Sequence, residues 1–329
     1  MPEGHSVHRI AKQFDRNFVG HRLEVSSPQG RFADGAKLLN GSELTEVWAV
    51  GKQMFMGFAG DNWLRVHLGI YGAWDFSGDI HADATIASAN GRMGQTNQRG
   101  TVFDDAVFDL DGENSLTSIG APRKTRVRMA EAEKESALDI SFPPEPIGQV
   151  RVRLLTETVC ADLRGPTACE VLGKAQVDAV LERLGPDPQR DPSDLSGQRF
   201  VDAIREKNTA IGLLLMDQSV VAGIGNVYRA EILFRAGIDP YRPGKQITED
   251  EAWALWRDWV YLLEIGVQTG QMMTIDGLEG EQWRKAMANR ADRHWVYKRE
   301  GLPCLNCGTN IRLDEMANRK LYWCPSCQT

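Results

Sequence analysis

The clearest fold signal in this chain is the segment DQSVVAGIGNVYRAEILF at residues 217–234. A buried helical pattern ends near Asp217, a turn passes through residues 221–225, and a second helical pattern begins at Asn226. Glycines before a helix let the backbone approach a ligand, and free N–H groups at a helix start favour an anion. A Gly-x-Gly pair is also common in tight turns that bind nothing. The segment alone therefore leaves a turn and a phosphate site both open.

The sequence around this segment predicts a helical domain. After LGPDPQRDP at 184–192, strand patterns give way to helical ones, so we place a domain boundary near residues 185–195. Helical patterns follow at SGQRFVDAIREKN (196–208) and at EDEAWALWRDWVYLLEIGVQTG (249–270). Together with the central turn they predict a helix-two-turn-helix domain at residues 186–285.

Four of the six cysteines lie in the last 26 residues, as two C-x-x-C pairs separated by sixteen residues. This spacing is typical of a structural zinc site on a β-hairpin, and so short a segment needs a metal because it cannot bury a sufficient core of its own. The sequence predicts one Zn²⁺ in a zinc ribbon at residues 286–329, held by Cys304, Cys307, Cys324 and Cys327. Arg319 lies at or near the hairpin tip, where it either reaches a phosphate or belongs to a solvated turn.

The N-terminal part reads as a β-sandwich domain at residues 1–185. From about residue 20 to 118, short stretches of alternating character are separated by Gly, Asn and Asp. Residues 5–18 place Val7, Ile10, Phe14 and Phe18 on one side of a helix that packs on the sheet. Residues 119–145 read as a charged insertion or loop, whose basic residues between 123 and 128 could touch a phosphate. The fold class predicted is a multidomain α+β protein.

Composition and charge limit the function classes. The chain has 329 residues, 42% of them hydrophobic, and its longest apolar run is AIGLLLM at 210–216, so we expect neither a membrane span nor a secretory signal. A net charge of −7 argues against a nucleic-acid partner over the whole surface. From residue 284 onward, however, nine Lys and Arg residues stand against four acids. Such polarity is typical of a protein with one nucleic-acid face.

Five motifs in order resemble the formamidopyrimidine-DNA glycosylase and endonuclease VIII family. They are MPEG at the start, the lysine of AVGKQMF, HLGIYG, the segment at 217–234, and the zinc ribbon with NRKLYWCPSCQ. PEG, in place of the PEL usual in the 8-oxoguanine branch, indicates the endonuclease VIII side. The resemblance implies a bifunctional DNA glycosylase and AP lyase of base excision repair, which excises oxidised bases, expected to be pyrimidines, and cleaves the strand by β,δ-elimination.

The resemblance also implies the catalytic residues. Removal of Met1 exposes Pro2, a secondary amine that attacks C1′ of the damaged nucleotide and forms an iminium. An α-amino group has a pKa of about 8, so a useful fraction is unprotonated at neutral pH. Glu3 shuttles protons to the sugar and away from C2′. Lys52, in a hairpin turn after Gly51, reaches a phosphate or the sugar at the lesion.

Four further residues are implied to contact DNA. Asn226 and Arg319 correspond to the phosphate clamps of the family, and Ile70 and Tyr71 to its intercalating side chains. For Ile70 and Tyr71 a place in the core is a serious alternative. The partner expected is damaged DNA, duplex or single-stranded, including abasic sites. We expect a monomer that works in the cytoplasm with the nucleoid.

Two departures from the family limit these expectations. Ser6 stands where the family commonly has an acid, and VCADLRGPTACEV (159–171) replaces the Asp-Pro-Arg-Arg-Phe type of loop. Opposite-strand discrimination is therefore expected to differ from the 8-oxoguanine branch. One alternative is a non-catalytic zinc-ribbon protein that recognises damaged or single-stranded DNA, which has no need of Pro2, Glu3 and Lys52. Another, a zinc-ribbon transcription or RNA-binding factor, leaves the helix pair around Asn226 unexplained.

Overall fold

The computed structural model describes residues 2–81, 118–119 and 142–329. The strands predicted between 82 and 117 and most of the charged insertion predicted at 119–145 lie outside these residues. The described chain packs into two compact units. The first comprises the described residues within Met1–Pro2, Ser6–Leu181 and Val267–Gly270, and the second comprises Glu3–His5, Glu182–Gly266 and Gln271–Thr329.

Two antiparallel sheets form the first unit. One has the order β2-β3-β4-β9 and the other β1-β7-β8-β5-β6. The strands are β1 (Glu24–Ser26), β2 (Leu44–Val50), β3 (Gln53–Phe58), β4 (Asn62–His67), β5 (Ala73–Gly78), β6 (Ser118–Ile119), β7 (Val150–Leu155), β8 (Val159–Arg164) and β9 (Ala168–Gly173). Both sheets contribute side chains to one hydrophobic core, as the predicted β-sandwich requires.

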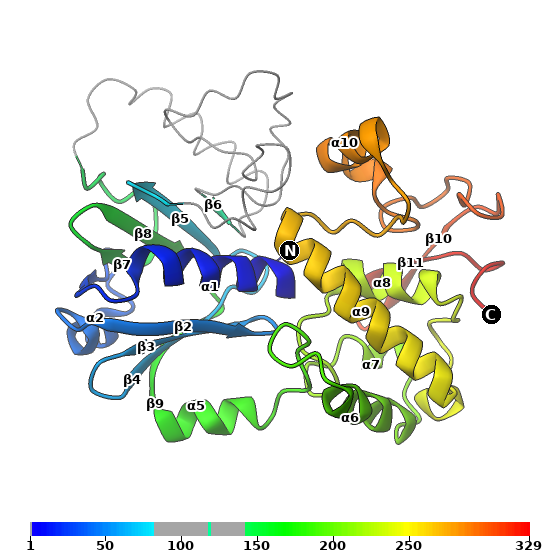
Figure 1. Ribbon diagram of the computed structural model, residues 1–329, viewed down its shortest axis with the longest axis horizontal. Helices are drawn as coiled ribbons and strands as arrows, with labels where there is room; N and C mark the ends of the chain where they lie inside the picture. Colours follow the sequence, from blue (N-terminus) through cyan, green and yellow to red (C-terminus); the bar gives the residue numbers. More distant parts are fainter. Residues whose placement is uncertain (1, 82–117, 120–141) are drawn as a thin grey trace. The chain divides into compact units, whose positions relative to one another are not determined.

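Helix α1 (Gly4–Phe18) completes this core (Figure 1). The predicted apolar face of α1 is buried, and its Phe14 ring lies 4.7 Å from the Trp74 ring and 5.1 Å from the Phe76 ring. Two further helices are α2 (Ala33–Leu39) and α5 (Lys174–Leu181). Helix α2 lies where the sequence predicted only strands. Its buried residues Ala36 and Leu39 are three apart, a helical spacing that the surrounding turn residues obscure.

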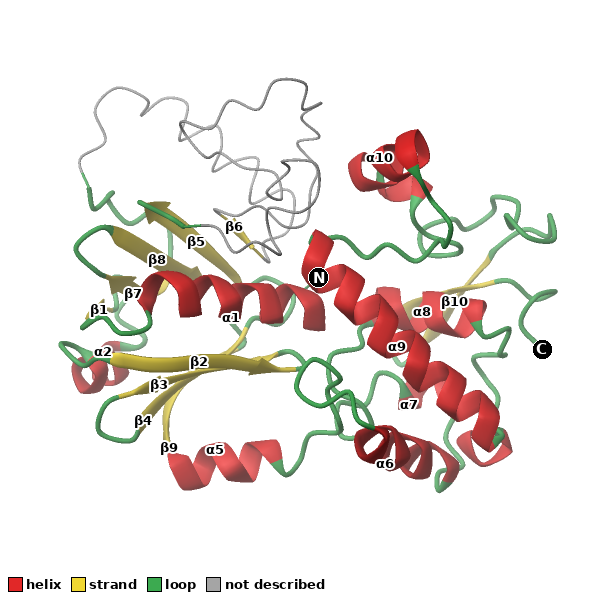
Figure 2. Cartoon of the chain, viewed as in Figure 1, coloured by secondary structure: helices red, strands yellow, loops and turns green. Residues whose placement is uncertain are grey.

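The second unit is mostly helical and ends in a β-hairpin (Figure 2). Its elements are α6 (Asp194–Arg205), α7 (Ile211–Leu214), α8 (Asn226–Arg235), the 3-10 helix η1 (Gly244–Gln246), most of α9 (Glu249–Thr269), α10 (Gly280–Ala288), the 3-10 helix η2 (Arg290–Asp292), β10 (Arg312–Met316) and β11 (Arg319–Trp323). None of the helices described is long and apolar enough to cross a membrane.

Local sequence explains several boundaries in this unit. Ser193 caps α6 by accepting a hydrogen bond from the Ser196 N–H. Thr248 and Glu251 form a reciprocal capping box at the start of α9. Ala317 and Asn318, both with positive φ, make the two-residue turn between β10 and β11. Arg319 is therefore the first residue of β11, beside the tip of the hairpin as predicted.

Candidate functional site

The start of α8 is occupied by the side chain of Glu3. Its fully buried carboxylate accepts hydrogen bonds from the backbone N–H groups of Gly225 (2.9 Å), Val227 (2.8 Å) and Tyr228 (3.3 Å). The sequence left open whether the N–H groups here bind a phosphate or belong to a tight turn, and these three donors bind the Glu3 carboxylate instead. The anion at the helix start belongs to the protein itself, and more than 220 residues of intervening sequence conceal the contact.

Close packing explains the glycine at position 225. A Cβ atom there would lie 2.4 Å from Cδ of Glu3, so any side chain would displace the carboxylate. The Gly4 N–H also donates to the Gly223 carbonyl at 2.9 Å, which fixes the chain just after Glu3. The Glu3 carboxylate is therefore held in place by the turn that precedes α8.

Asn226 joins the start of α8 to the zinc hairpin. Its Nδ2 donates to the Lys320 carbonyl at 2.8 Å, and its Oδ1 accepts from Arg229 Nη2 at 2.6 Å. The same guanidinium nitrogen donates to the Lys320 carbonyl at 3.1 Å. Arg319, the neighbour of Lys320, is exposed. The Lys320 carbonyl and Arg229 thus bring together two predicted DNA-contacting residues, Asn226 and Arg319.

Arg229 is a buried cation beside Asn226 and the Lys320 carbonyl. Burial lowers its pKa to about 10, the nearby Glu3 carboxylate opposes this shift, and the positive charge of Arg319 adds to it. Arg229 was not among the predicted site residues. The available signal was its spacing of three residues from Asn226 on a helix, which brings the two side chains to the same face.

In the first unit, Lys52 lies in the tight turn between β2 and β3, as predicted, where Gly51 has φ of 56°. Gln53, the next residue, pairs with His67 at the end of β4. Burial lowers the pKa of His67, and the positive charges of Lys52 and Arg65 lower it further. Lys52 and His67 therefore lie close enough to interact. His67 was also missed, although it opens the HLGIYG motif.

The turn after β4 exposes two apolar side chains. Ile70 is 46% and Tyr71 70% accessible to solvent, so the alternative that they are core residues is wrong. Pro2 is buried and belongs to the first unit. Ser6, the departure from the family, is buried in α1.

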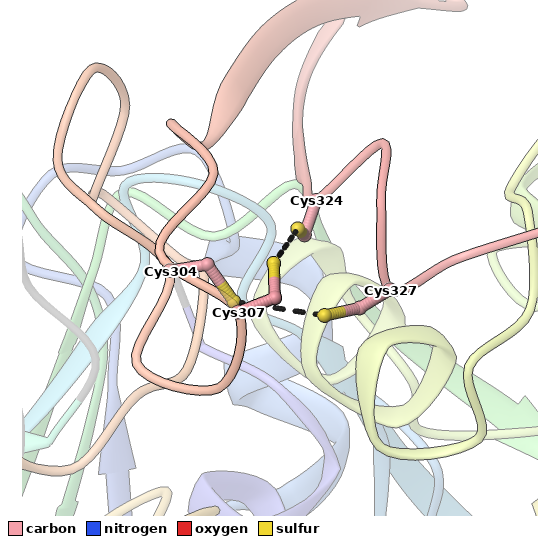
Figure 3. Close-up of side chains that lie close together, drawn as sticks. All are labelled: Cys304, Cys307, Cys324 and Cys327. Carbon is pink, nitrogen blue, oxygen red and sulfur yellow. Dashed lines mark hydrogen bonds between the residues drawn. The ribbon is translucent and has the colours of Figure 1, made fainter.

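The four predicted zinc ligands form one cluster (Figure 3). Their Sγ atoms all lie within 4.8 Å of one another, with 3.8 Å between Cys304 and Cys327 and 3.5 Å between Cys307 and Cys324. A tetrahedral Zn²⁺ with Zn–S bonds of about 2.3 Å requires sulfur separations of about 3.8 Å, so the cluster fits one structural zinc ion. Asn306 donates N–H bonds to two of the sulfurs at 3.4 Å, which stabilises thiolates.

Without metal, two thiols of this cluster differ strongly in pKa. Hydrogen bonds from Thr309 lower the pKa of Cys307 to about 6, whereas burial raises the pKa of Cys327 to about 12. A bound zinc ion deprotonates its coordinating thiols outright, so this difference disappears in the metal-bound protein.

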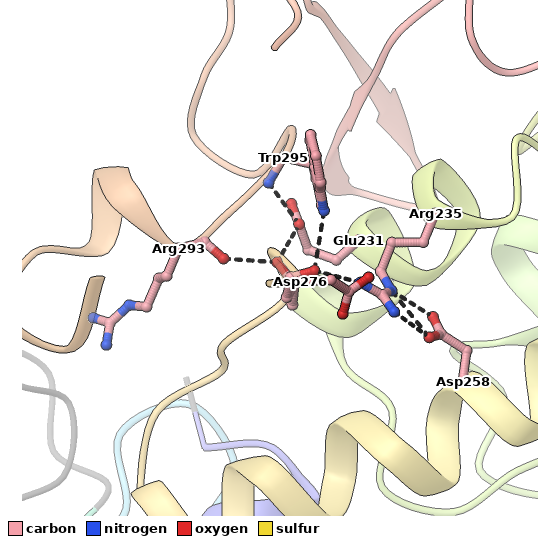
Figure 4. A network of polar contacts seen from close by, with 7 residues as sticks. Glu231, Arg235, Asp258, Asp276, Arg293 and Trp295 are labelled. Carbon is pink, nitrogen blue, oxygen red and sulfur yellow. Dashed lines mark hydrogen bonds and ion pairs between the residues drawn. The ribbon is translucent and has the colours of Figure 1, made fainter. Parts of the chain in front are cut away.

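Two charged side chains on α8 hold the chain between α9 and the zinc ribbon (Figure 4). Glu231 accepts from the backbone N–H groups of residues 295, 296 and 297 at 2.8–3.0 Å and from the Thr274 hydroxyl at 2.5 Å. Arg235 pairs with Asp258 and Asp276 and donates to the Thr274 carbonyl. Burial raises the pKa of Glu231. Helix α8 is thus a common anchor for the turn before it, the hairpin and this connection.

The chain is similar to known proteins over each of its parts. Three family models match in order: the formamidopyrimidine-DNA glycosylase N-terminal domain at residues 1–127, its H2TH domain at 184–276, and the zinc finger found in FPG and IleRS at 301–329. The protein named endonuclease 8 1 from Mycobacterium tuberculosis is 37% identical over 329 residues, which is all of both chains. A formamidopyrimidine-DNA glycosylase from Thermus thermophilus is 37% identical over 149 residues, covering 45% of this chain and 55% of its own.

Solved structures agree on the fold. The MutM (Fpg) protein of Thermus thermophilus has a TM-score of 0.64 at 23% identity, covering 99% of this chain and 98% of its own. A complex between Lactococcus lactis Fpg and DNA containing an abasic site has a TM-score of 0.67 at 16% identity, covering 99% of both chains. These likenesses confirm the predicted fold class, and the full-length relative confirms the predicted resemblance. The chain therefore belongs to the formamidopyrimidine-DNA glycosylase and endonuclease VIII family of DNA repair glycosylases.

Proposed function

We propose that this protein is a bifunctional DNA glycosylase and AP lyase that removes oxidised bases through an N-terminal proline. One observation carries the proposal: the residue directly after Pro2 is a fully buried carboxylate held by three backbone N–H groups. A buried carboxylate is costly unless it is well bonded, and its fixed position beside the terminal nitrogen suits proton transfer at the reacting sugar.

The chemistry follows from the free amine of Pro2. After removal of Met1, the proline nitrogen attacks C1′, and the base departs with the electrons of the glycosidic bond. Glu3 takes the N–H proton that Pro2 loses on attack and delivers it to the sugar ring oxygen, whose bond to C1′ breaks as the iminium forms. The iminium makes the C2′ protons acidic, so loss of one expels the 3′-phosphate, and a second elimination expels the 5′-phosphate. Water hydrolyses the remaining iminium, which releases the sugar fragment as an aldehyde and returns the free amine of Pro2.

Phosphate groups are the proposed ligands of Lys52, Asn226 and Arg319. We add His67, which lies near Lys52 and whose lowered pKa keeps it neutral at pH 7, so it would donate a hydrogen bond without a second charge. The base must leave the stack before any amine can reach C1′. Ile70 and Tyr71, exposed in one turn, are proposed to fill the vacated space.

Oxidised pyrimidines, single-stranded DNA and abasic sites are the proposed substrates, ahead of 8-oxoguanine opposite cytosine. Only residues 165–167 lie between β8 and β9, which leaves no room here for a long loop that fills the gap opposite the extruded base. The sequence PEG supports the same preference. We also propose a monomer, active on the nucleoid in the cytoplasm, with a catalytic part at 1–185, a helical part at 186–285 and a zinc ribbon at 286–329.

The decisive experiment is borohydride trapping on a duplex with one abasic site. Borohydride reduces the iminium to a stable amine, so we expect a covalent protein–DNA product of one-to-one stoichiometry. Binding without a covalent product would instead support the alternative of a non-catalytic DNA-binding protein. A lesion panel follows, in which thymine glycol and 5-hydroxyuracil should be released faster than 8-oxoguanine. The opposite order would refute the proposed preference and leave the mechanism standing.

A further inference from the structure

Arg229 is a buried cation whose direct partners are neutral. The residue is 1% exposed, and its hydrogen bonds go to Asn226 Oδ1, to the Lys320 carbonyl and, at 3.5 Å, to the Gly212 carbonyl. Its Nε has no hydrogen-bond partner among the described residues. Buried charges are normally paired with an opposite charge, because desolvation is expensive. By contrast, Arg235, further along α8, has two aspartates.

The contacts of Arg229 determine the orientation of the Asn226 amide. A guanidinium has only donors, so it must face the amide oxygen, and a carbonyl has only acceptors, so Lys320 O must face the amide nitrogen. The amide therefore cannot flip without losing both bonds. One of the two Nδ2 hydrogens is donated to the Lys320 carbonyl, and the other has no hydrogen-bond partner among the described residues, so it is available to an external acceptor.

Arg229 also connects two elements far apart in the sequence. Its Nη2 binds residues of α8 and of β11, which lie 94 positions apart. Lys320 directly follows Arg319 at the tip of the hairpin, so holding its carbonyl fixes the backbone from which the Arg319 side chain projects. The Glu3 carboxylate and the Arg319 guanidinium both act on Arg229, so two cations and one carboxylate lie near the amide donor and positive charge is in excess. Such a group favours an anion.

We propose that Arg229 is the positioning residue of the phosphate site. By holding the Asn226 oxygen and the Lys320 carbonyl together, it makes the start of α8 and the zinc hairpin one preformed site for a phosphodiester. This inference rests on the proposed function, since it assumes that Asn226 contacts DNA. Preformation lowers the entropic cost of binding, because the amide and the hairpin need not be ordered by the ligand.

A double-mutant cycle tests the inference. The probe is a duplex with one tetrahydrofuran site, which binds but cannot react because its C1′ carries no leaving group. We expect Arg229→Met and Asn226→Ala each to weaken binding about tenfold, within the range for a lost hydrogen bond to a charged group. The double variant should bind about as well as either single one, because both remove the same contact.

A matched control uses Arg235, the partly buried arginine further along α8. Arg235→Met also removes a partly buried charge, but the hydrogen bonds of Arg235 go to Asp258, Thr274 and Asp276 and none goes to Asn226. Its effect on binding should therefore add to that of Asn226→Ala. Arg229→Lys keeps the positive charge but loses the planar guanidinium that contacts two acceptors at once. Its affinity for DNA should therefore lie between those of wild type and Arg229→Met. Zinc content and circular dichroism of each variant report whether the hairpin is intact.

The outcomes separate this inference from the proposed function. If Asn226→Ala binds like wild type, the phosphate contact of the proposed function is wrong. If Asn226→Ala binds weakly but Arg229→Met adds a full independent loss, the positioning role is overturned and the function stands. Should Arg229→Met not fold, Arg229→Lys takes its place in the same cycle. A loss of affinity from Arg229→Lys that disappears in the Asn226→Ala background supports the positioning role, whereas a loss that persists in full overturns it.

Discussion

The zinc cluster and the start of α8 both gather polar groups, but they are assembled in different ways. The cysteines lie within 24 residues, and a metal ion supplies the attraction between them. At the start of α8, Glu3, Asn226 and Lys320 come from three distant parts of the chain and are held only by hydrogen bonds. Local motifs with a metal can be recognised in a sequence. Sites assembled from distant segments depend on the fold.

Blocking the N-terminus should have the largest effect on the reaction, because it converts the amine of Pro2, on which the proposed chemistry depends, into an amide. In a protein that retains Met1, or carries an uncleaved tag, the proline nitrogen is an amide without a nucleophilic lone pair. We expect no borohydride trapping, with DNA binding largely preserved. Mass spectrometry establishes which terminus each preparation has. Efficient trapping by the tagged protein would exclude Pro2 and make Lys52 the first suspect.

Glu3→Gln should come next, with base excision reduced about 100-fold or more, as for loss of a general acid. Activity on a preformed abasic site should fall less. The amide also has one oxygen in place of two, so at least one N–H at the start of α8 loses its acceptor, at a cost of about 1–3 kcal/mol.

Glu231→Gln is the matched control for this change. Glu231 lies on α8 and also accepts three backbone N–H bonds, so its replacement should lower stability by a similar amount. Trapping at saturating DNA should be unaffected, since Glu231 takes no part in the chemistry. Equal losses of trapping in the two variants would mean that Glu3 acts only as a helix cap.

Disruption of the zinc cluster should have a smaller effect on the reaction. Cys304→Ser removes one of four ligands, and the hairpin that carries Arg319 should lose its fold. We expect affinity for abasic DNA to fall about tenfold or more, a loss typical of missing hydrogen bonds to phosphate. The trapping rate at saturating DNA should stay close to wild type. Elemental analysis that finds no zinc in active, carefully purified protein would contradict the role of the metal.

The smallest effect expected is a change in salt dependence, which distinguishes the two phosphate contacts. Arg319→Ala should reduce the slope of log Kd against log salt by about one, because one counterion fewer is released. Asn226→Ala should lower affinity with little change in slope, since the amide is neutral. A slope unchanged in Arg319→Ala would indicate that the hairpin tip points to solvent.

Much of the fold was predictable from local pattern. The helix with Val7, Ile10 and Phe14 inward and the start of α8 at Asn226 were both confirmed, because periodicity and turn glycines depend on neighbours in the chain. The strand prediction missed α2, because so short a helix carries too few apolar positions to stand out. The roles assigned to Pro2, Lys52 and the other DNA-contacting residues stay predictions.

The sequence by itself determined the family, the order of β-rich, helical and zinc-ribbon segments, and the four zinc ligands, since each motif is encoded over fewer than about 30 residues. Only the tertiary structure decided that Glu3 occupies the N–H groups at α8, that Arg229 joins Asn226 to Lys320, and that Ile70 and Tyr71 are exposed. The physical reason is that a hydrogen bond acts over about 3 Å of space. Such a contact leaves no periodic trace in the chain when its partners lie as far apart in sequence as Asn226 and Lys320 or Glu3 and Val227.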